Sequence, residues 1–435
     1  MDKEYFRALA GDALLLAKEL FPINRSLSND GVEKSLQILS KDIPTFKIKK
    51  FKSRAKMSDW RVPMRWNVRG AYIRNLAGDI IVNYADNNLH VISHSQPINR
   101  KVSKKVLLDH LYSLPDMPDT IPYVTSYYKK KWGFCLSENQ KKQLTDDYYF
   151  VEIDATFDQR PMVYGELFIP GKLKSKEIFF STYVCHPSMA NNELSGPVVA
   201  HGLIKHLLAK DNMYSYRFVF IPETIGSISY IASNLEAMKK NIIGGFALSC
   251  VGDERAFSII SSRTNNNPLE DVLESNILSL DEERQSPFTS YSFLHRGSDE
   301  RQYCSPGVDL PISGFCRSKY GTYPEYHTSD DNFNVVTQAG LMGSLEVLIN
   351  MINDVERLDF PIAKFICEPN MGKRGLYPSV GAQKKTAFVK NCMNILAYSD
   401  GTNSIQTISR IIGCDETEVS EIVSILRSKG TITKV

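Results

Sequence analysis

The sequence lacks an apolar run that could cross a membrane, because none of its hydrophobic stretches approaches the roughly 20 residues that a spanning helix needs. It also lacks cysteine pairs of the CxxC type, and its eight cysteines are scattered singly along the chain. No apolar signal segment opens the chain, since Met1 to Glu4 lead directly into an amphipathic helix. We therefore expect a cytoplasmic protein with reduced thiols and no membrane partner.

A strong charge of one sign is also missing. The formal net charge is +3 at pH 7, which is too small to imply a nucleic acid or a membrane surface as partner. What the chain does have is length, because 435 residues suffice for two or three domains with a large core. Its composition is that of an ordinary globular protein with many Tyr and Phe residues.

One stretch organises the rest of the chain. Residues 177–184 are a continuous apolar run that predicts a buried parallel strand, and residues 194–208 predict a helix. Between them lies the irregular segment CHPSMANNE, residues 185–193. Ligands bind beyond the carboxyl ends of the strands in open α/β sheets. His186 is therefore placed where an imidazole could bind a metal ion.

Three later segments deliver polar side chains in the same way. Glu223 follows a buried strand at 218–222, Asp253 follows another at 245–251, and His327 lies in a later loop. Two histidines and two carboxylates are the set that a hydrolytic zinc site uses, with one carboxylate free to act as general base. The alternative is that the carboxylates cap helices and that the histidines are buried and hydrogen-bonded.

The order of these motifs resembles that of the zinc aminopeptidase and glutamate carboxypeptidase family. In that family a first His ligand is followed by a metal-bridging Asp in an Asp-Asn-x-Ser-Gly turn. A Glu-Glu pair, an Asp ligand and a last His ligand come after it. The resemblance implies that His186, Asp253 and His327 are metal ligands and that Glu223 is the general base.

Two positions depart from the pattern of that family. Asn192 stands where the bridging Asp is expected, and Thr224 stands where the second Glu of the pair is expected. Both losses fall on the shared or second-metal side. Three alternatives follow: the site holds one metal, Glu193 supplies the missing carboxylate, or the chain has lost metal chemistry.

These departures bear on the number of zinc ions. Two close cations need a bridging anion to offset their mutual repulsion, and Asn192 is neutral. We expect at most one tightly held zinc ion, bound by His186, His327 and either Asp253 or Glu193. Two zinc ions would require Glu193 as the bridge.

The chain also resembles a narrower group, the aminopeptidase-like proteins found with bacterial surface-polysaccharide gene sets. The match covers nearly the whole length and includes motifs at 62–68, 114–128, 132–135 and 185–197. It implies an α/β fold, a zinc-exopeptidase-like mixed sheet flanked by helices. An inserted β-rich module and a C-terminal winged helix complete the expected architecture.

The residue patterns divide the chain accordingly. Residues 1–50 and 147–370 are predicted to form the aminopeptidase-like domain. Residues 51–146 contain short alternating runs separated by turns, which predict the β-rich insert. Residues 380–435 contain three short helices and a final strand, which resemble a winged helix.

Local signals give several element bounds. Helices are predicted at 5–21, at 32–39 with Asp30 as the N-cap, and at 266–278. Residues 279–292 are predicted to be a surface loop.

The third helix of the winged helix starts with acidic residues, whereas a DNA-reading helix should be basic. We therefore expect no nucleic-acid partner and assign this domain to docking or dimerisation. A homo-oligomer could form through this domain or through the insert.

Four residues near the motifs are candidate substrate contacts: Asn192, Asp299, Arg301 and Tyr326. Arg301 suits a substrate carboxylate or phosphate. It could instead pair internally with Asp299 or Glu300.

Three other groups have two interpretations each. Arg25 could meet a substrate carboxylate or a structural one, and His90 and His94 could belong to the core or to the surface. The third group is aromatic and could stack on a sugar or a peptide, or form the core of the insert: Tyr123, Tyr127, Tyr128 and Trp132.

The function predicted is a metal-dependent hydrolase of the aminopeptidase type. It would cleave an amide bond in a peptide, an aminoacyl sugar or an N-acyl sugar, with Glu223 taking the proton of a zinc-activated water molecule. A second hypothesis is a non-catalytic binding protein on a peptidase scaffold, because Asn192 and Thr224 replace carboxylates. A third is a transcriptional regulator that uses the winged helix.

Overall fold

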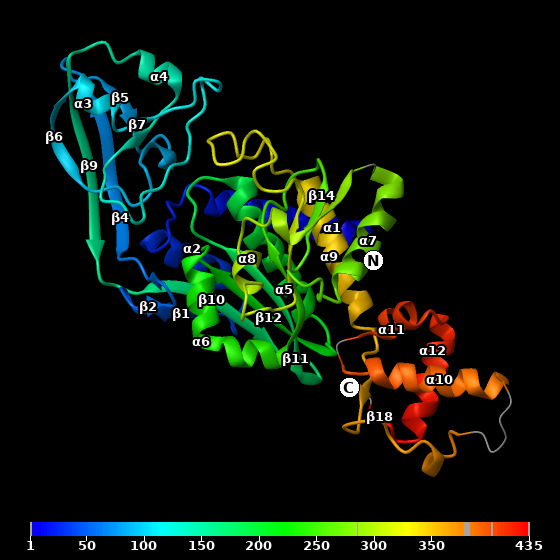
Figure 1. The fold of residues 1–435 in the computed structure, drawn as a ribbon. Coiled ribbons are helices and arrows are strands. Elements are labelled where there is room, and N and C mark those ends of the chain that lie inside the picture. Colours follow the sequence, from blue (N-terminus) through cyan, green and yellow to red (C-terminus); the bar gives the residue numbers. More distant parts are fainter. Residues whose placement is uncertain (1, 285, 378–382, 402, 434–435) are drawn as a thin grey trace. The chain divides into compact units, whose positions relative to one another are not determined.

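The computed structural model describes residues 2–284, 286–377, 383–401 and 403–433 (Figure 1). The chain forms two compact units. The first comprises Met1–Asn267 and Glu274–Ile349, and the second comprises Pro268–Leu273 and Asn350–Val435. Among the described residues, no helix is both long and apolar enough to cross a membrane.

The first unit is built on an eight-stranded mixed sheet with the order β1-β10-β12-β11-β13-β16-β14-β15. Its central strands β12, β11, β13 and β16 run parallel, so their carboxyl ends meet at one edge. These central strands are almost wholly apolar because both faces of a parallel sheet are buried. The strands are β1 (Lys47–Phe51), β10 (Met162–Ile169), β11 (Leu173–Tyr183), β12 (Tyr214–Ile221), β13 (Ile242–Leu248), β14 (Phe257–Ile260), β15 (Phe288–Tyr291) and β16 (Ile312–Cys316).

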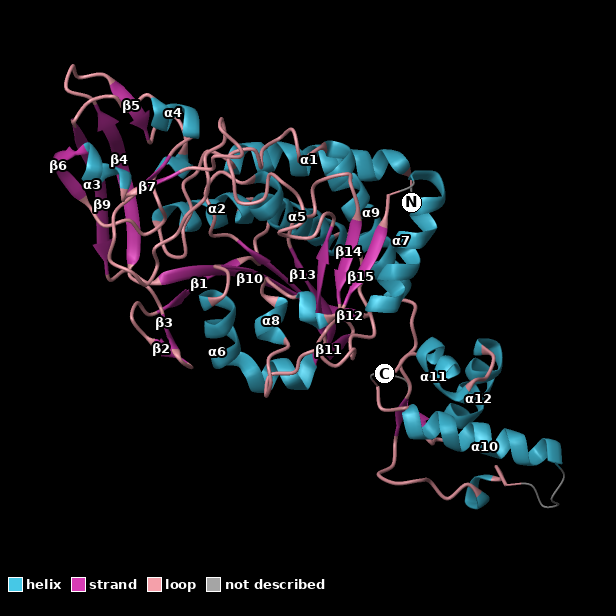
Figure 2. Cartoon of the chain, turned by 45° about the horizontal axis from the view of Figure 1, so that its top comes forward, coloured by secondary structure: helices cyan, strands magenta, loops and turns pink. Residues whose placement is uncertain are grey.

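Helices cover both faces of this sheet. Figure 2 shows α1 (Lys3–Leu20), α2 (Asp30–Ser40) and α5 (Ser195–Leu208) on one face, and α6 (Ile225–Asn241) with α8 (Glu300–Tyr303) on the other. The helix α9 (Gln338–Val355) follows the last of the site loops. Asn29, not the predicted Asp30, caps α2, because its side chain accepts a hydrogen bond from the backbone N–H of Val32.

One predicted loop is a regular structure. The helix α7 (Glu270–Arg284) extends beyond the predicted end at 278, and β15 forms an edge strand of the main sheet. The prediction of a surface loop at 279–292 was therefore wrong. An edge strand is half-exposed and tolerates polar residues, so FTSY has no apolar run that would reveal it.

The inserted module has its own sheet, with the order β5-β4-β9-β6. Its core contains Trp66, Phe134, Tyr149 and Val151. The strand β9 lies beyond the predicted module boundary at residue 146 and pairs with both β4 and β6, so the module sheet extends to Asp158. Its elements are β2 (Lys56–Met57), β3 (Trp60–Arg61), β4 (Arg65–Arg74), β5 (Ile80–Asn83), η1 (Asn88–His90), β6 (Ile98–Ser103), α3 (Lys104–Leu108), β7 (Leu111–Tyr112), β8 (Phe134–Cys135), α4 (Glu138–Lys142) and β9 (Tyr148–Asp158).

The second unit contains a winged helix. Its helices are α10 (Gln383–Tyr398), α11 (Ile405–Ile412) and α12 (Glu416–Ser428), and β17 (Ile362–Ala363) pairs with β18 (Ile432–Thr433). Gly413 ends α11 with a φ of 64°, a conformation that glycine adopts readily, so the turn predicted between the two helices forms there. The core packs Ile395, Ile408 and Val423 against one another.

Candidate active site

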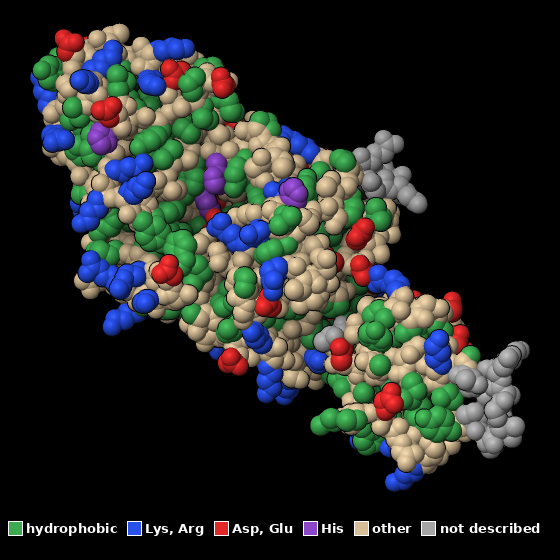
Figure 3. Space-filling view, viewed as in Figure 1, with side chains coloured by type: hydrophobic (Ala, Val, Ile, Leu, Met, Phe, Trp, Pro, Cys, Tyr) green, Lys and Arg blue, Asp and Glu red, His purple; other side chains and the backbone are tan. Residues whose placement is uncertain are grey.

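Four of the predicted site residues line a cavity of about 290 Å³ at the carboxyl ends of β11 and β12: His186, Glu223, Arg301 and His327. Figure 3 shows histidines (purple) with Lys or Arg side chains (blue) beside them at a hollow of the first unit. Both the main sheet domain and the inserted module contribute to its wall. The lining residues are Leu27, Trp60, Tyr123, Thr125, Tyr127, Tyr128, His186, Glu223, Thr224, Ile225, Arg301 and His327.

His186 is held in a defined orientation between two carboxylates. Its Nδ1 lies 2.9 Å from Oε2 of Glu193, and its Nε2 lies 3.7 Å from Oε2 of Glu223. A carboxylate can only accept a hydrogen bond, so Nδ1 carries a proton, and in the neutral imidazole Nε2 keeps its lone pair on the cavity side. This is how carboxylates orient metal-binding histidines in proteins.

Glu193 itself is paired with a buried cation. It lies in the π-helical turn η2 (Ala190–Leu194), and its Oε1 is 3.4 Å from Nε of Arg25. Both side chains are fully buried. Arg25 also donates hydrogen bonds to the carbonyl oxygens of Leu20 and His186. Of the two interpretations of Arg25, the structure supports the pairing with a structural carboxylate.

The surroundings of His186 favour positive charge. Burial alone would lower the pKa of His186, but the hydrogen bond and the charge of Glu193, with the charge of Glu223, raise it overall. An environment that stabilises an imidazolium also attracts a metal cation.

Glu223 precedes a strained turn. Thr224 has φ 62° and ψ −77°, and the N–H of Ile225 donates to the carbonyl oxygen of Glu223 at 2.8 Å. These values describe a γ-turn with positive φ, which is rare and costly for a residue with a side chain. Such strain is typical of functional sites, and here it lies directly after Glu223.

Asp299 stabilises this turn from its buried side. Its Oδ1 accepts hydrogen bonds of 2.8 Å from the N–H of Thr224 and from Oγ of Ser227. Asp299 is buried and does not line the cavity, so the structure places it behind the turn and not at the predicted substrate contact.

The carboxyl groups of this turn have raised pKa values. Burial raises the pKa of Glu223, although the charges of His186 and Arg301 oppose the shift. Burial and the charge of Glu223 raise the pKa of Asp299 to about 7. A carboxyl group that exchanges its proton closer to neutral pH is better suited to general acid–base catalysis.

His327 lies beside His186 in the cavity wall, with Tyr326 packed behind it. The ring centroid of His327 lies 5.5 Å from that of His186, and Tyr326 stacks on His327 at 4.0 Å. Burial lowers the pKa of His327 to about 3, so its imidazole is neutral at physiological pH. Tyr326 supports His327 and does not line the cavity.

Asp253 lies in a different hydrogen-bonding environment. Its two carboxylate oxygens accept four hydrogen bonds, from Asn191, from Arg255 and twice from Ser318. These bonds occupy the carboxylate and tie it to the turn behind the cavity, so they do not favour the predicted role of Asp253 as a metal ligand.

Asn192 is also behind the cavity. Its amide Nδ2 donates to the hydroxyl of Tyr183 at 2.7 Å, and its N–H donates to Asp331. Asp331 also accepts from the N–H of Asn191. Sequence reasoning missed Asp331, and its only signal was its place four residues after His327.

One group of buried side chains has the spacing of a metal site. The ligand atoms of Cys185, His186 and Glu193 all lie within 4.8 Å of one another. The thiol sulfur of Cys185 also accepts a hydrogen bond from the N–H of Glu223. This group lies deeper than the cavity, because neither Cys185 nor Glu193 lines it.

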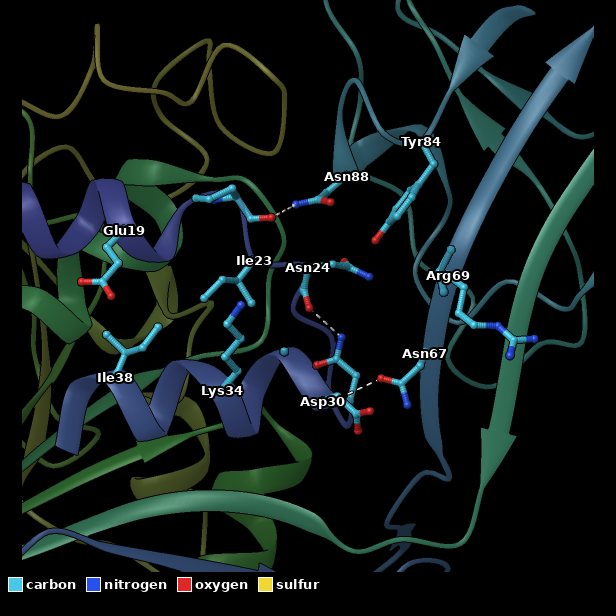
Figure 4. Close-up of a pocket in the computed structure, with 14 residues that line it drawn as sticks. Glu19, Ile23, Asn24, Asp30, Lys34, Ile38, Asn67, Arg69, Tyr84 and Asn88 are labelled. Atoms are coloured by element: carbon cyan, nitrogen blue, oxygen red, sulfur yellow. Dashed lines mark hydrogen bonds between the residues drawn. The ribbon is translucent and has the colours of Figure 1, made fainter. Parts of the chain in front are cut away.

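A larger groove of about 660 Å³ lies between the turn that joins α1 to α2 and the strand β4 (Figure 4). Two hydrogen bonds connect the two sides of this groove. Asn88 donates to the carbonyl oxygen of Pro22, and the N–H of Asp30 donates to Asn67. The predicted catalytic and metal-binding residues do not line this groove. The cavity at His186 is therefore the candidate active site.

Comparison with known proteins defines the family. The profile of a domain of unknown function (DUF4910) matches residues 14–358, and a winged helix-turn-helix profile matches residues 362–434. A Clostridium acetobutylicum protein, named as a candidate polysaccharide biosynthesis protein with an aminopeptidase-like domain, is 38% identical over 401 residues. The alignment covers 92% of this chain and 91% of that protein. The chain belongs to the aminopeptidase-like DUF4910 family.

Solved structures agree with this DUF4910 assignment. A candidate peptidase from Clostridium acetobutylicum aligns with a TM-score of 0.81 and 34% identity, covering 100% of this chain and 98% of that chain. A zinc aminopeptidase from Bacillus subtilis aligns with a TM-score of 0.58 and 13% identity, covering 81% of this chain and 95% of that chain. An M28 peptidase precursor from Shewanella amazonensis has a TM-score of 0.56 and 10% identity, covering 84% and 98%. The predicted fold, an aminopeptidase-like mixed sheet followed by a winged helix, is confirmed.

Proposed function

We propose that this DUF4910 protein is a metal-dependent amide hydrolase whose active site is the cavity at His186 and Glu223. The observation that carries the proposal is the orientation of His186. Glu193 holds its Nδ1, and its Nε2 faces Glu223 at 3.7 Å in a cavity that His327 also lines.

The donor set of the cavity suits one zinc ion. Imidazoles are common zinc ligands, and catalytic zinc sites leave a position open for water. The cavity supplies two imidazoles, and its carboxylate, Glu223, is assigned here to the base. Both imidazoles present this chemistry, because His327 is neutral and Nε2 of His186 keeps its lone pair. We propose that His186 and His327 hold the ion and that Glu223 lies beside it.

The deeper group at Cys185 suits a metal less well. The guanidinium of Arg25 already balances the charge of Glu193, and a divalent cation there would lie close to that guanidinium. Glu193 also holds Nδ1 of His186, so metal binding would break this contact. We therefore propose that Glu193 orients His186 and does not act as a ligand or bridge, which leaves one zinc ion.

A bound zinc ion would polarise the amide carbonyl and lower the pKa of water. Glu223 takes a proton from the attacking water molecule and delivers it to the leaving nitrogen. One C–O bond forms, the C–N bond breaks, and the products are a carboxylic acid and an amine. The γ-turn at Thr224 and the buried Asp299 keep the Glu223 side chain in place.

Metal analysis combined with the variant Glu223→Gln tests this proposal. We expect about one transition metal ion per chain after zinc supplementation. In Glu223→Gln, hydrolysis should fall at least about 100-fold while the metal remains, because general bases contribute roughly that much.

The matched control is Glu325→Gln, since Glu325 pairs with Arg255 and does not line the cavity. It should keep both metal and activity. A protein without stoichiometric metal would contradict the mechanism, and loss of metal in Glu223→Gln would make Glu223 a ligand.

A second candidate function is a non-catalytic binding protein on the same scaffold. The observation that favours it is the hydrogen bonding of Asp253, which is expected to be a ligand and instead has four other contacts. Hydrolysis of any amide that disappears in His186→Ala would exclude it.

For the winged helix we propose docking or dimerisation in place of DNA binding. Glu416 and Glu418 lie in the first turn of α12, and the guanidinium of Arg427 near its end bonds to Asp359. Few positive charges of this helix thus remain for phosphate groups. We also propose a cytoplasmic location, which is supported by the lack of disulfides among the eight cysteines, all of which lie in the described residues.

A further inference from the structure

The carboxylates around the cavity are already engaged. A substrate with a free amino terminus carries an ammonium group, which a carboxylate would have to bind. Glu193 pairs with Arg25, Asp253 has four hydrogen bonds, and Asp299 is buried beneath the turn. Among the described residues, Glu223 is the one carboxylate that lines the cavity, and the proposed reaction uses it as the base.

The cavity instead offers a cation with unused hydrogen-bonding groups. Arg301 lines it, and its Nη2 donates to Oγ1 of Thr224 at 2.6 Å. Its Nε is buried and has no hydrogen-bond partner. Within the part of the chain that the structure describes, no carboxylate forms a direct ion pair with this guanidinium, although the charges of Glu223 and Asp299 act on it.

Thr224 strengthens this charge pattern. Its side chain is neutral and adds no negative charge beside Glu223, and its hydroxyl accepts the hydrogen bond from Arg301. A half-buried guanidinium that lacks a direct ion pair is costly, and an anion that reaches it gains a charge-assisted hydrogen bond.

Another part of the cavity wall is aromatic and comes from the inserted module. Trp60 in β3 and Tyr128 contact each other edge to face, with ring centroids 5.6 Å apart. Both rings keep large exposed fractions, 38% and 57%. Tyr127 and Tyr123 continue this wall, and their hydroxyls share a hydrogen bond of 2.7 Å. Such a wall accepts a planar or apolar group by stacking.

We propose, on the basis of the proposed function, that the substrate is an anionic amide and not a peptide with a free amino terminus. Its carboxylate or phosphate group binds Arg301. Its planar or apolar part lies on the wall formed by Trp60, Tyr127 and Tyr128. The amide between them lies against His186 and Glu223.

Binding measurements with four small amides test this inference without requiring turnover. The probes are N-benzoylglycine (a carboxylate), N-benzoylaminomethylphosphonate (a phosphate-like anion), N-benzoylglycinamide (neutral) and glycine anilide (a cation). Calorimetry uses the metal-loaded Glu223→Gln protein, which prevents hydrolysis. We expect at least one anionic probe to bind about tenfold or more tightly than the neutral probe, because charge-assisted hydrogen bonds to Arg301 are added. The anionic probe that binds more tightly shows whether Arg301 prefers a carboxylate or a phosphate-like group.

Substitutions assign the preference to Arg301. Arg301→Gln should remove the difference between anionic and neutral probes, and Arg301→Lys should keep part of it. The control is Arg296→Gln, because Arg296 is an exposed cation shortly before α8 that does not line the cavity. Tighter binding of glycine anilide, unchanged anion affinity in Arg301→Gln, or no binding of any probe at millimolar concentration would overturn the inference.

These outcomes separate the inference from the proposed function. If the protein binds anions through Arg301 but holds no metal, the proposed hydrolase function is refuted, whereas the inference that Arg301 recognises an anion is retained. Metal-dependent hydrolysis confined to substrates with a free amino terminus would refute the inference and leave the hydrolase standing.

Discussion

Arg25 and Glu193 place two opposite charges in the dry interior behind the proposed catalytic histidine. Neither side chain is exposed, and Arg25 also binds two backbone carbonyl oxygens. A buried ion pair need not stabilise the fold compared with an apolar pair, but removing one partner leaves an uncompensated charge. The pair therefore couples the stability of the fold to the orientation of His186.

Arg25→Met should lower the free energy of unfolding by about 3–5 kcal/mol, because Glu193 would remain buried without its cation. Adding Glu193→Met should recover part of this loss. Urea denaturation of both variants measures the effect. The control is Arg69→Met, since Arg69 forms an exposed pair with Asp154 and should change the stability little. An Arg25→Met protein as stable as the wild type would contradict this role of the ion pair.

His94 predicts a pH dependence of stability. It is buried between Ser26, Trp66 and Tyr127, and burial lowers its pKa to about 3. In the unfolded chain His94 binds a proton below about pH 6.5. The unfolded state therefore takes up more protons between these values, and stability falls as the pH drops from about 6.5 toward 3.

Replacing this residue should reduce that dependence. His94→Phe removes the titrating group, so the denaturation midpoint should fall less between pH 7 and pH 5 than in the wild type. His295→Gln, at an exposed position, should leave the pH dependence unchanged. A wild-type slope in His94→Phe would show that other groups control this range.

For single residues, the sequence predicted spatial proximity better than it predicted the contacts and role of each side chain. His186, Glu223 and His327 were expected together and do line one cavity, because carboxyl ends of parallel strands share an edge. Side-chain direction is not visible in the order of residues. Asp253 therefore turns toward Ser318, and Glu193 turns toward Arg25.

Among the elements, the inserted module matters most for the site. The strand β3 brings Trp60 to the cavity wall, and the segment after β7 brings Tyr123, Tyr127 and Tyr128. The sequence left open whether these aromatics form a core or a binding surface. The structure separates them, since Trp132 packs in the module core and the three tyrosines line the cavity.

Element bounds were less predictable where pairing is non-local. The strand β9 lies beyond the predicted module boundary because its partners β4 and β6 are distant in sequence. The edge strand β15 has too few apolar residues to be recognised without its neighbour β14. The central strands were predicted because their continuous apolar runs do not depend on a partner.

Trp60→Ala should weaken binding of the anionic benzoyl probes several-fold and leave the fold intact. The ring is partly exposed, so little core packing is lost, whereas a stacking surface disappears. Calorimetry measures the affinity, and thermal melting checks the fold. Leu76→Ala, another exposed apolar residue of the module, should not change the affinity. Unchanged binding in Trp60→Ala would remove the aromatic wall from the site.

For the whole molecule, we expect the proposed hydrolysis to depend on the first unit and the proposed docking or dimerisation on the second. The cavity and the residues proposed as metal ligands and base all belong to the first unit, and the winged helix belongs to the second. Ending the chain at residue 361 should therefore preserve metal content and amide hydrolysis. If the winged helix mediates dimerisation, light scattering should show that truncation halves the native mass. A full-length monomer, or a salt-dependent DNA affinity that truncation abolishes, would contradict this role.

The central claim is that one metal ion lies in the cavity between His186 and His327. Anomalous-scattering maps from crystals of zinc-supplemented protein, collected on both sides of the zinc absorption edge, test it most directly. The account predicts a single peak at bonding distance from Nε2 of His186 and from the imidazole of His327. An empty cavity, a peak at the Cys185 group, or two adjacent peaks bridged by Glu193 would contradict it.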